Sequence, residues 1–301
     1  MGPGAMGCLF AARLSKAGFD VTLLDYIAER AKQINGQGIL VHGVTGQYSV
    51  KVPTVVGEVP SHPDVVLICV KSYKTQQASE SIKPWLRTDA MVVTLQNGVG
   101  NVEILEQVFG KDRILGGVTS EGATLLGPGK IRHAGQGETI IGPGGDPGGP
   151  AEKLVSAFSQ AGFKTKSVDN VSDLIWGKLI INVGINALTA ITRLKNGRLP
   201  EVRGTRRVLK EAVKEAATVA AAKKVQLPYP DPLGRVIQVC EATAGNIASM
   251  LQDVLKEKET EVDAINGAIV REGKALGIPT PVNLTLTSLV HAIQETYSER
   301  I

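Results

Sequence analysis

The sequence predicts an α/β chain in which an N-terminal doubly wound sheet is followed by an all-helical domain. Short runs of Val, Ile and Leu alternate with helical patterns as far as Asp169, and almost no strand pattern occurs after it. The chain has 301 residues, whereas a typical domain has about 100–200. We therefore expect a dinucleotide-binding domain at residues 1–169 and a helical substrate-binding domain at residues 170–301.

The expected strands are short and apolar on both faces, as in a buried parallel sheet. They lie at residues 20–25, 65–70, 91–95, 114–117 and 163–168. Helical patterns lie between them at residues 8–17, 28–35, 74–83, 102–108 and 151–161. This alternation indicates a doubly wound sheet. Two small hairpins are expected at residues 39–52 and 130–141.

The second domain is expected to contain only helices. They are predicted at residues 171–192, 203–223, 232–256, 261–276 and 282–298. Gly277, followed closely by Pro279, is a typical helix stop. The Gly- and Pro-rich run at residues 142–150 is interpreted as a turn before a helix that opens at Pro150.

Composition narrows the function classes. The chain is 43% hydrophobic and 21% charged, as in globular proteins, and its net charge of +4 is spread along the sequence. That balance suits small anionic ligands but lacks the basic stripe of a nucleic-acid-binding protein. The cysteines Cys8, Cys69 and Cys240 are widely spaced, and the four histidines do not cluster with acids. We expect reduced thiols and no metal site.

The chain is also expected to be cytoplasmic. No basic leader with an apolar core opens it, which argues against a signal peptide. No segment reaches the roughly 20 apolar residues that a membrane span requires. We therefore expect no membrane partner.

A glycine pattern opens the chain. Gly2, Gly4 and Gly7 form G-x-G-x-x-G around Ala5 and Met6, and a helical pattern follows. In dinucleotide-binding loops these glycines allow a tight turn, close approach to the pyrophosphate, and close helix packing. The helix N-terminus then favours the negative phosphates.

Three later positions fit the same site. Asp25 ends the next expected strand, where an acid would accept hydrogen bonds from the ribose hydroxyls. Lys71 and Asn97 follow two further strands, where doubly wound sheets bind ligands. An ordinary solvated lysine and an Asn-Gly turn are alternative readings of these last two positions.

A polar stripe interrupts the most apolar helix. Lys178, Asn182 and Asn186 recur at a spacing of four, which places them on one helix face. Such groups are costly in a buried helix unless something polar faces them. Satisfied core polar groups or an interface seam would explain the stripe, but the floor of a polar ligand site explains it better, because interior lysines are rare without a partner.

A second polar set lies further along the chain. Asn246, Ser249 and Asp253 are spaced for one face of the helix expected at residues 232–256, and Glu261 opens the next helix. Alone, this set would indicate only a solvent-exposed face of the helix. Together with the lysine stripe, it suits a small hydroxylated carboxylate substrate.

Besides the glycine loop, the chain contains several distinctive motifs. They are C-V-K at 69–71, Q-N-G-V-G at 96–100, W-G-K-L-I-I-N-V-G-I-N-A-L-T-A at 176–190, K-N-G at 195–197, N-I-A-S-M-L-Q-D at 246–253 and T-E-V-D-A-I-N-G at 260–267. These motifs resemble those of the 2-dehydropantoate 2-reductase, or ketopantoate reductase, family. They occur in the family's order over nearly the whole chain. The Lys–Asn–Asn helix and the Ser-Met-Leu-Gln-Asp segment are specific to the family, whereas the glycine loop alone is not.

The resemblance implies a Rossmann domain, a helical domain, an active site in the cleft between them, and NADPH-dependent reduction of ketopantoate to pantoate on the route to pantothenate and coenzyme A. It implies that Lys178 donates the proton to the substrate carbonyl. The implied substrate-binding residues are Asn97, Asn182, Asn186, Asn196 and Ser249, to which the second polar set adds Asn246. The implied cofactor site is lined by residues 2–7, Lys71, Asn97, Ala123 and Glu261. Because a carboxylate favours a charged lysine, Glu261 is also the candidate that holds Lys178 protonated.

Two departures from the family pattern carry expectations of their own. Family members commonly have an arginine after the second strand, where this chain has Asp25 and Tyr26. An acid there would repel the 2′-phosphate of NADP, so we expect weaker NADP preference than is usual in the family, or preference for NAD, unless Arg30 reaches the phosphate. Only Met1 precedes Gly2. We expect the native chain to begin upstream with a central strand; the alternatives are that another segment pairs there or that the sheet tolerates a gap.

Other functions remain open at this level. A sister dehydrogenase would act on another 2-keto acid, an opine-like compound or a glycerol phosphate. A non-catalytic dinucleotide sensor would not need Lys178, Asn182 and Glu261 together. A ketol-acid reductoisomerase would need a carboxylate cluster for magnesium, which the long helices lack. The expected partner is a small 2-keto acid, and a homodimer stays open.

Overall fold

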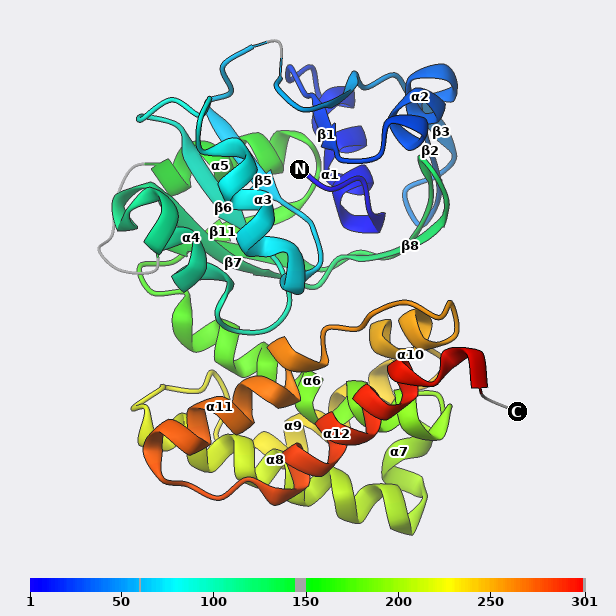
Figure 1. Ribbon diagram of the computed structural model, residues 1–301, viewed down its shortest axis with the longest axis vertical. Coiled ribbons are helices and arrows are strands. Elements are labelled where there is room, and N and C mark those ends of the chain that lie inside the picture. Colours follow the sequence, from blue (N-terminus) through cyan, green and yellow to red (C-terminus); the bar gives the residue numbers. More distant parts are fainter. Residues whose placement is uncertain (60, 144–149, 300–301) are drawn as a thin grey trace. The chain divides into compact units, whose positions relative to one another are not determined.

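The computed structural model describes residues 1–59, 61–143 and 150–299, which form two compact units (Figure 1). Unit 1 comprises Met1–Gln96 and Asn101–Val171, and unit 2 comprises Asn97–Gly100 and Ser172–Ile301. The short segment Asn97–Gly100 follows a strand of unit 1 in sequence but packs with the helices of unit 2.

A five-stranded sheet, ordered β11-β10-β7-β6-β5, is the centre of unit 1. Its members are β5 (Val65–Ile68), β6 (Met91–Thr94), β7 (Ile114–Thr119), β10 (Glu138–Pro143) and β11 (Lys164–Ser167). Strands β5, β6 and β7 are parallel, β10 is antiparallel to β7, and β11 is parallel to β10. The strands expected at residues 65–70, 91–95 and 114–117 form the parallel part. The strand expected at residues 163–168 is present as β11, but it is mostly exposed and runs antiparallel to those three.

Helices cover both faces of this sheet. Val92 packs into a core with α3 (Thr75–Ile82) and α4 (Asn101–Phe109), whereas its neighbour Val93 packs with α1 (Ala5–Lys16) and α5 (Pro150–Gln160). Successive strand residues point to opposite faces, so this alternation confirms a doubly wound sheet. The run at 144–149 lies outside the described residues.

Beside β5 lies a separate parallel pair, β1 (Leu23–Asp25) and β4 (Thr54–Val56), with α2 (Ala28–Gln37) packed on it. Met1 and Gly2 connect the two sheets. The Met1 amine donates to Leu67 O at 2.7 Å, the Cys69 N–H donates to Met1 O at 2.8 Å, and the Gly2 N–H donates to Leu24 O at 2.9 Å. Met1 and Gly2 therefore form backbone hydrogen bonds with the β5 segment on one side and with β1 on the other.

A four-stranded sheet, β3-β2-β9-β8, completes unit 1. It contains β2 (Ile39–Gly43), β3 (Tyr48–Val50), β8 (Gly122–Gly127) and β9 (Lys130–Gly135). The expected hairpin at residues 39–52 is confirmed by the antiparallel β2–β3 pair. The hairpin expected at residues 130–141 is wrong, because β9 pairs with β8 across the turn at Pro128 and Gly129, while β10 joins the central sheet.

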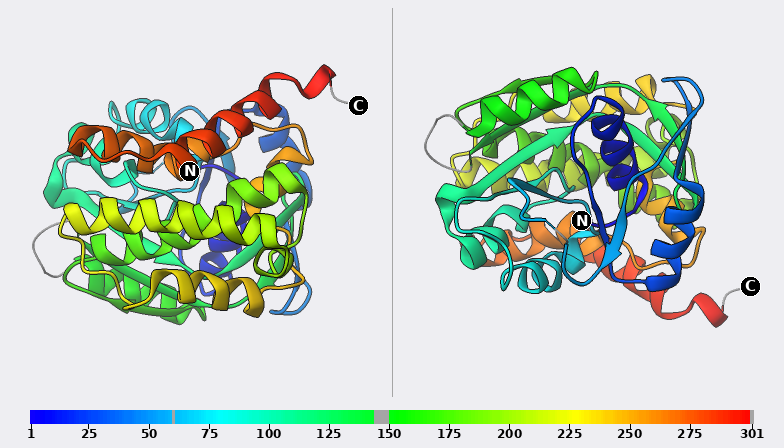
Figure 2. Two further views of the ribbon diagram at one scale, coloured as in Figure 1. Left: turned by 90° about the horizontal axis from the view of Figure 1, so that it is seen from below. Right: turned by 90° about the horizontal axis from the view of Figure 1, so that it is seen from above.

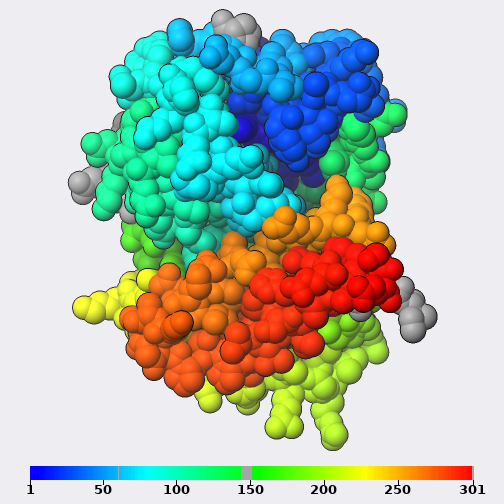
Figure 3. Space-filling view, viewed as in Figure 1, coloured from blue at the N-terminus to red at the C-terminus, as the bar shows by residue number. Residues whose placement is uncertain are grey.

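Unit 2 is helical. It contains α6 (Ser172–Thr192), α7 (Arg198–Glu201), α8 (Arg203–Ala222), α9 (Pro232–Ala242), α10 (Ser249–Val254), α11 (Asn266–Leu276) and α12 (Pro281–Glu295). Short 3₁₀ turns are η3 (Val262–Ala264) here, η4 (Tyr297–Glu299) at the end, and η1 (Ser72–Lys74) and η2 (Lys111–Arg113) in unit 1. Helix α8 lies alongside both α12 and α9 (Figure 2, left), and α11 and α12 are neighbours in Figure 3.

The single helix expected at residues 232–256 is wrong: α9 ends at Ala242 and α10 begins at Ser249. Gly245 lies in the break, and the carbonyls of Ala244 and Asn246 accept bonds from the Gly197 and Asn196 N–H groups at 3.3 and 3.2 Å. These long-range bonds replace bonds within a helix. Asn246, Ser249 and Asp253 consequently do not share one helix face.

Helix α6 is the core of unit 2. It is long and apolar enough to cross a membrane by composition, but 67% of its most apolar window is buried inside the protein. Leu179, Ile180 and Val183 are at most 1% exposed and pack against α8, α9 and α12. The apolar length of α6 is thus explained by packing within unit 2.

Candidate active site

The glycine loop of unit 1 leaves space where a ligand could lie. A Cβ on Gly7 would be 2.0 Å from Gly2 O, and Gly2 has φ +94° with Val70 atoms 2.9 Å from an added Cβ. Both positions therefore require glycine. A Cβ on Gly4 would meet nothing within 4 Å. Gly4 is the N-cap of α1 without a side-chain hydrogen bond, and Ala5 and Met6 form its first turn, which has no acidic residue. This cradle fits a dinucleotide pyrophosphate.

Asp25 ends β1 and is joined to Arg30 of α2. The Arg30 Nε donates to Asp25 Oδ2 at 2.6 Å, and Arg30 Nη2 donates to Oδ1. The N–H groups of Tyr26 and Ile27 also donate to Oδ1, at 2.6 and 3.1 Å. The Asp25 side chain is 0% exposed, whereas that of Arg30 is 23% exposed. At this strand end the guanidinium is thus the accessible group.

A partly buried network missed by the sequence analysis joins the ends of β5 and β6. The Gln96 amide donates to Val70 O at 2.7 Å and to Thr75 Oγ1 at 2.9 Å, and Thr75 donates to Asn101 Oδ1 at 2.8 Å. Lys71 follows Val70 directly and is the N-cap of η1. The network therefore fixes the backbone on which Lys71 lies.

In unit 2, Lys178 of α6 and Glu261 interact electrostatically. Burial lowers the pKa of Lys178 to about 8, and the Glu261 carboxylate opposes this shift. Lys178 and Asn182 are half-buried, while Asn186, one turn further, is 4% exposed. The stripe thus runs from an accessible end, which bears the lysine, into the core.

Asn97 is held beside the segment that bears Glu261. Glu261, 8% exposed, directly precedes η3, and the Val99 N–H donates to Ala264 O at 3.2 Å. Gly98 has φ +85°, and a Cβ there would be 2.3 Å from Ala264 O. The two segments are therefore in tight backbone contact. Asn97 follows strand β6, as expected, and belongs to unit 2 with Lys178 and Glu261.

The remaining predicted substrate residues lie at or against the connection between α9 and α10. Asn196 lies against the α9–α10 connection, where its Nδ2 donates to Thr243 Oγ1 at 2.9 Å and its N–H to Asn246 O. Among the described residues, the buried Oδ1 of Asn196 has no hydrogen-bond partner. Asn246 and Ser249 are exposed, and Ser249 is the first residue of α10.

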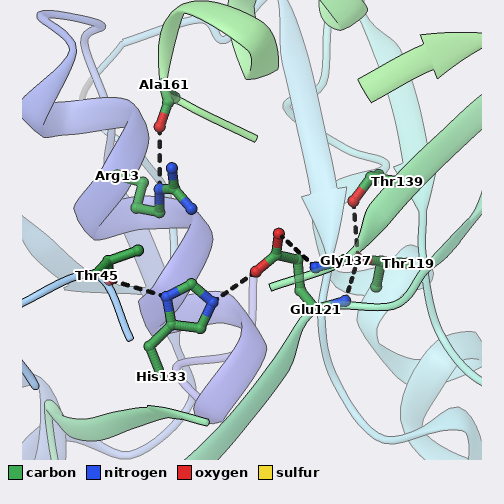
Figure 4. A network of polar contacts seen from close by, with 8 residues as sticks. All are labelled: Arg13, Thr45, Thr119, Glu121, His133, Gly137, Thr139 and Ala161. Atoms are coloured by element: carbon green, nitrogen blue, oxygen red, sulfur yellow. Dashed lines mark hydrogen bonds and ion pairs between the residues drawn. The ribbon is translucent and has the colours of Figure 1, made fainter. Parts of the chain in front are cut away.

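Ala123 in β8 pairs with His133 in β9, and His133 belongs to a second network that the sequence analysis missed (Figure 4). His133 Nε2 is 2.5 Å from Glu121 Oε2, and its Nδ1 is 2.9 Å from Thr45 Oγ1. The His133 and Glu121 side chains are 0% and 1% exposed. The network connects the β2–β3 loop, the residue before β8 and strand β9. Thr45, Glu121 and His133 are too far apart in sequence to form a recognisable motif.

Two family models match the chain. Residues 1–146 match "Ketopantoate reductase PanE/ApbA", and residues 170–294 match its C-terminal part. The chain belongs to the ketopantoate reductase family. It is 37% identical to 2-dehydropantoate 2-reductase of Halobacterium salinarum, over 97% of each chain.

Solved structures agree with this assignment. A PanE/ApbA family ketopantoate reductase from Ralstonia eutropha is 35% identical, with a TM-score of 0.89 over 99% of this chain and 98% of that one. D-mandelate dehydrogenase with NADH and anilino(oxo)acetate is 31% identical, with a TM-score of 0.90 over the same shares. The fold is thus that of nicotinamide-dependent oxidoreductases.

Proposed function

We propose that the protein reduces 2-dehydropantoate to pantoate with a nicotinamide cofactor, with Lys178 as the proton donor and Glu261 as the group that holds Lys178 charged. The observation that carries the proposal is the half-buried Lys178, whose pKa of about 8 allows it to donate a proton near neutral pH. The matching relatives act on this substrate, and a dinucleotide-binding loop is present. A non-catalytic sensor would need no such lysine.

The cofactor, when bound, supplies the hydride to the keto carbon. The chain's own residues do the rest. The glycine cradle and α1 N-terminus bind the pyrophosphate, and Lys71 and Ala123 line the cofactor site. The ammonium of Lys178 stabilises negative charge on the substrate oxygen and then protonates it at that atom. Asn97, Asn182, Asn186, Asn196, Asn246 and Ser249 orient the hydroxyl and carboxylate of the substrate by hydrogen bonds.

We further propose that the enzyme discriminates only weakly between NADH and NADPH. The Asp25 carboxylate is covered by Arg30 and two backbone N–H groups, so it neither repels a 2′-phosphate strongly nor offers free oxygens to the ribose. The partly exposed guanidinium of Arg30 can bind a phosphate or a hydroxyl. This geometry modifies the expectation of NAD preference, which assumed a free Asp25.

We also propose that the protein is soluble and cytoplasmic, since the apolar α6 is explained by packing within unit 2 and Cys8, Cys69 and Cys240 are free thiols. A homodimer remains a prediction.

The test is the oxidation of NADH and NADPH by the purified protein with 2-dehydropantoate, pyruvate, 2-ketoisovalerate, 2-ketoisocaproate and phenylglyoxylate. The last compound is the keto acid that corresponds to mandelate. We expect the highest kcat/KM with 2-dehydropantoate. A higher value with phenylglyoxylate would instead support the mandelate-type specificity of the structural neighbour, and no oxidation with any keto acid would refute a reductase.

A further inference from the structure

A buried amide network connects the two acid–base residues of unit 2 through the backbone. We propose that Asn266 is a positioning residue for the Lys178–Glu261 pair, acting by fixing η3 against α6. The inference rests on the proposed function for the roles of Lys178 and Glu261.

Asn266 is the first residue of α11 and is 0% exposed. Its Nδ2 donates to Val183 O of α6 at 3.2 Å and to Asn283 Oδ1 of α12 at 2.9 Å. Val183 lies directly after Asn182 of the polar stripe. The amide therefore ties the start of α11 to the part of α6 that bears the proposed site.

The far end of the network is anchored by a charge. Asn283 Nδ2 donates to Ala212 O at 3.0 Å and to Glu215 Oε2 at 2.7 Å. Glu215 of α8 also accepts the N–H groups of Val282 and Asn283, at 2.8 and 2.9 Å. It thus satisfies the first turn of α12, whose own N-cap, Thr280, makes no side-chain bond. The orientation of Asn283, and hence of the Asn266 amide, is well determined.

Only a short, internally bonded turn separates Asn266 from Glu261. The Ala264 N–H donates to Glu261 O at 3.1 Å, and the Ile265 N–H donates to Val262 O at 3.2 Å. The same turn holds Asn97 through the bond between Val99 and Ala264. Fixing Asn266 on α6 therefore fixes Glu261 and Asn97 relative to Lys178.

Packing alone is a poor explanation of this amide. Among the described residues, the buried Oδ1 of Asn266 has no hydrogen-bond partner. A buried polar atom without a partner lowers stability, and an apolar side chain would avoid that cost. An amide that is unfavourable for packing but bonded to α6 fits a role in geometry.

The ionisation of Lys178 reports on this geometry without requiring catalysis. Competitive acetylation with acetic anhydride as a function of pH, read by mass spectrometry of the Lys178 peptide, gives the apparent pKa of that amine. We would compare wild type, Asn266→Ala, Glu261→Gln and the double variant. Asn283→Ala is a second variant that frees the Asn266 amide without changing residue 266. Val219→Ala, a core truncation in α8, is the control for lost stability.

If Asn266 positions Glu261, Asn266→Ala lowers the apparent pKa of Lys178 by about one pH unit, because the opposing carboxylate is displaced. Asn283→Ala shifts it in the same direction, and Val219→Ala leaves it unchanged. In the Glu261→Gln background, Asn266→Ala has no further effect, since the residue through which it acts is already neutral. An unchanged pKa in Asn266→Ala, or an equal shift in the Glu261→Gln background, would overturn the inference. Failure of the proposed function would be seen separately, as absent keto acid reduction by wild type.

Discussion

Lys178 of the apolar helix α6 interacts electrostatically with Glu261, which directly precedes η3. Burial lowers the lysine pKa to about 8, and the carboxylate limits that decrease. A proton donor must be protonated before it reacts, so under the proposed role of Lys178 this relationship sets the pH range in which the enzyme works.

The pH profile should follow this pair. We expect kcat to be highest below pH 8 and to fall as pH rises through about 8, where Lys178 loses its proton. Glu261→Gln removes the carboxylate that favours the charged amine, so the fall should move to lower pH. Steady-state rates between pH 6 and 10 with saturating substrates give the pH at which kcat falls. If that pH is the same in Glu261→Gln as in wild type, Glu261 does not influence the ionisation of Lys178.

Substitutions in the glycine loop should distinguish an effect on NAD(P)H affinity from an effect on stability. Gly4→Ala places a methyl group where the protein has no atom within 4 Å, and its φ of −75° suits alanine. The Tm should be unchanged, while the Kd for NAD(P)H rises on the order of tenfold because the methyl group obstructs the pyrophosphate. Gly7→Ala, which clashes with Gly2 O, should instead lower the Tm. Equal nucleotide affinity in wild type and Gly4→Ala would place the pyrophosphate elsewhere.

Cofactor choice should depend on Arg30. Arg30→Ala leaves Asp25 without its cation, so the uncompensated carboxylate repels a 2′-phosphate. We expect kcat/KM with NADPH to fall about tenfold or more relative to NADH, given the usual preference of arginine for phosphate. Lys32→Ala, an exposed change on the same helix, is the control. If kcat/KM falls equally with NADH and NADPH, Arg30 does not contact the 2′ position of the cofactor.

The Glu121–His133 pair should contribute strongly to the stability of unit 1. Glu121→Ala removes the carboxylate that lies 2.5 Å from Nε2 of the fully buried His133 and leaves that ring nitrogen without its partner, at a cost of about 3 kcal/mol. Glu138→Ala breaks the exposed pair with Lys166 and should cost less than about 1 kcal/mol. Urea unfolding measures both free energies of unfolding. A similar loss in the free energy of unfolding for the two variants would show that the buried pair contributes no more than the exposed one.

The sequence predicted the parts of the fold whose pattern is local. Helix α6 begins one residue after its expected start and ends where expected, because its apolar composition is continuous and a polar stripe marks one face. The break at Gly245 was missed, since the bonds that replace the helix come from Asn196 and Gly197, far away in sequence. The β8–β9 hairpin was missed for a similar reason: β10 continues directly after β9 but finds its partners in another sheet.

The candidate site shows the same division. Spacing alone placed Lys178, Asn182 and Asn186 on one helix, and the glycine pattern identified the cradle. The cover that Arg30 forms over Asp25 requires knowledge of side-chain directions after β1, which no spacing gives. The placement of Asn97 beside η3 likewise depends on a close backbone contact at Gly98. Such long-range contacts determine what each residue can bind.

The central claim is that Lys178 is the proton donor of a 2-keto acid reductase, and the turnover of Lys178→Ala tests it most directly. With 2-dehydropantoate and NADPH, and with folding and nucleotide affinity shown to match wild type, we expect kcat to fall by about 10²–10⁴-fold. A folded Lys178→Ala variant with near-wild-type kcat would contradict the claim.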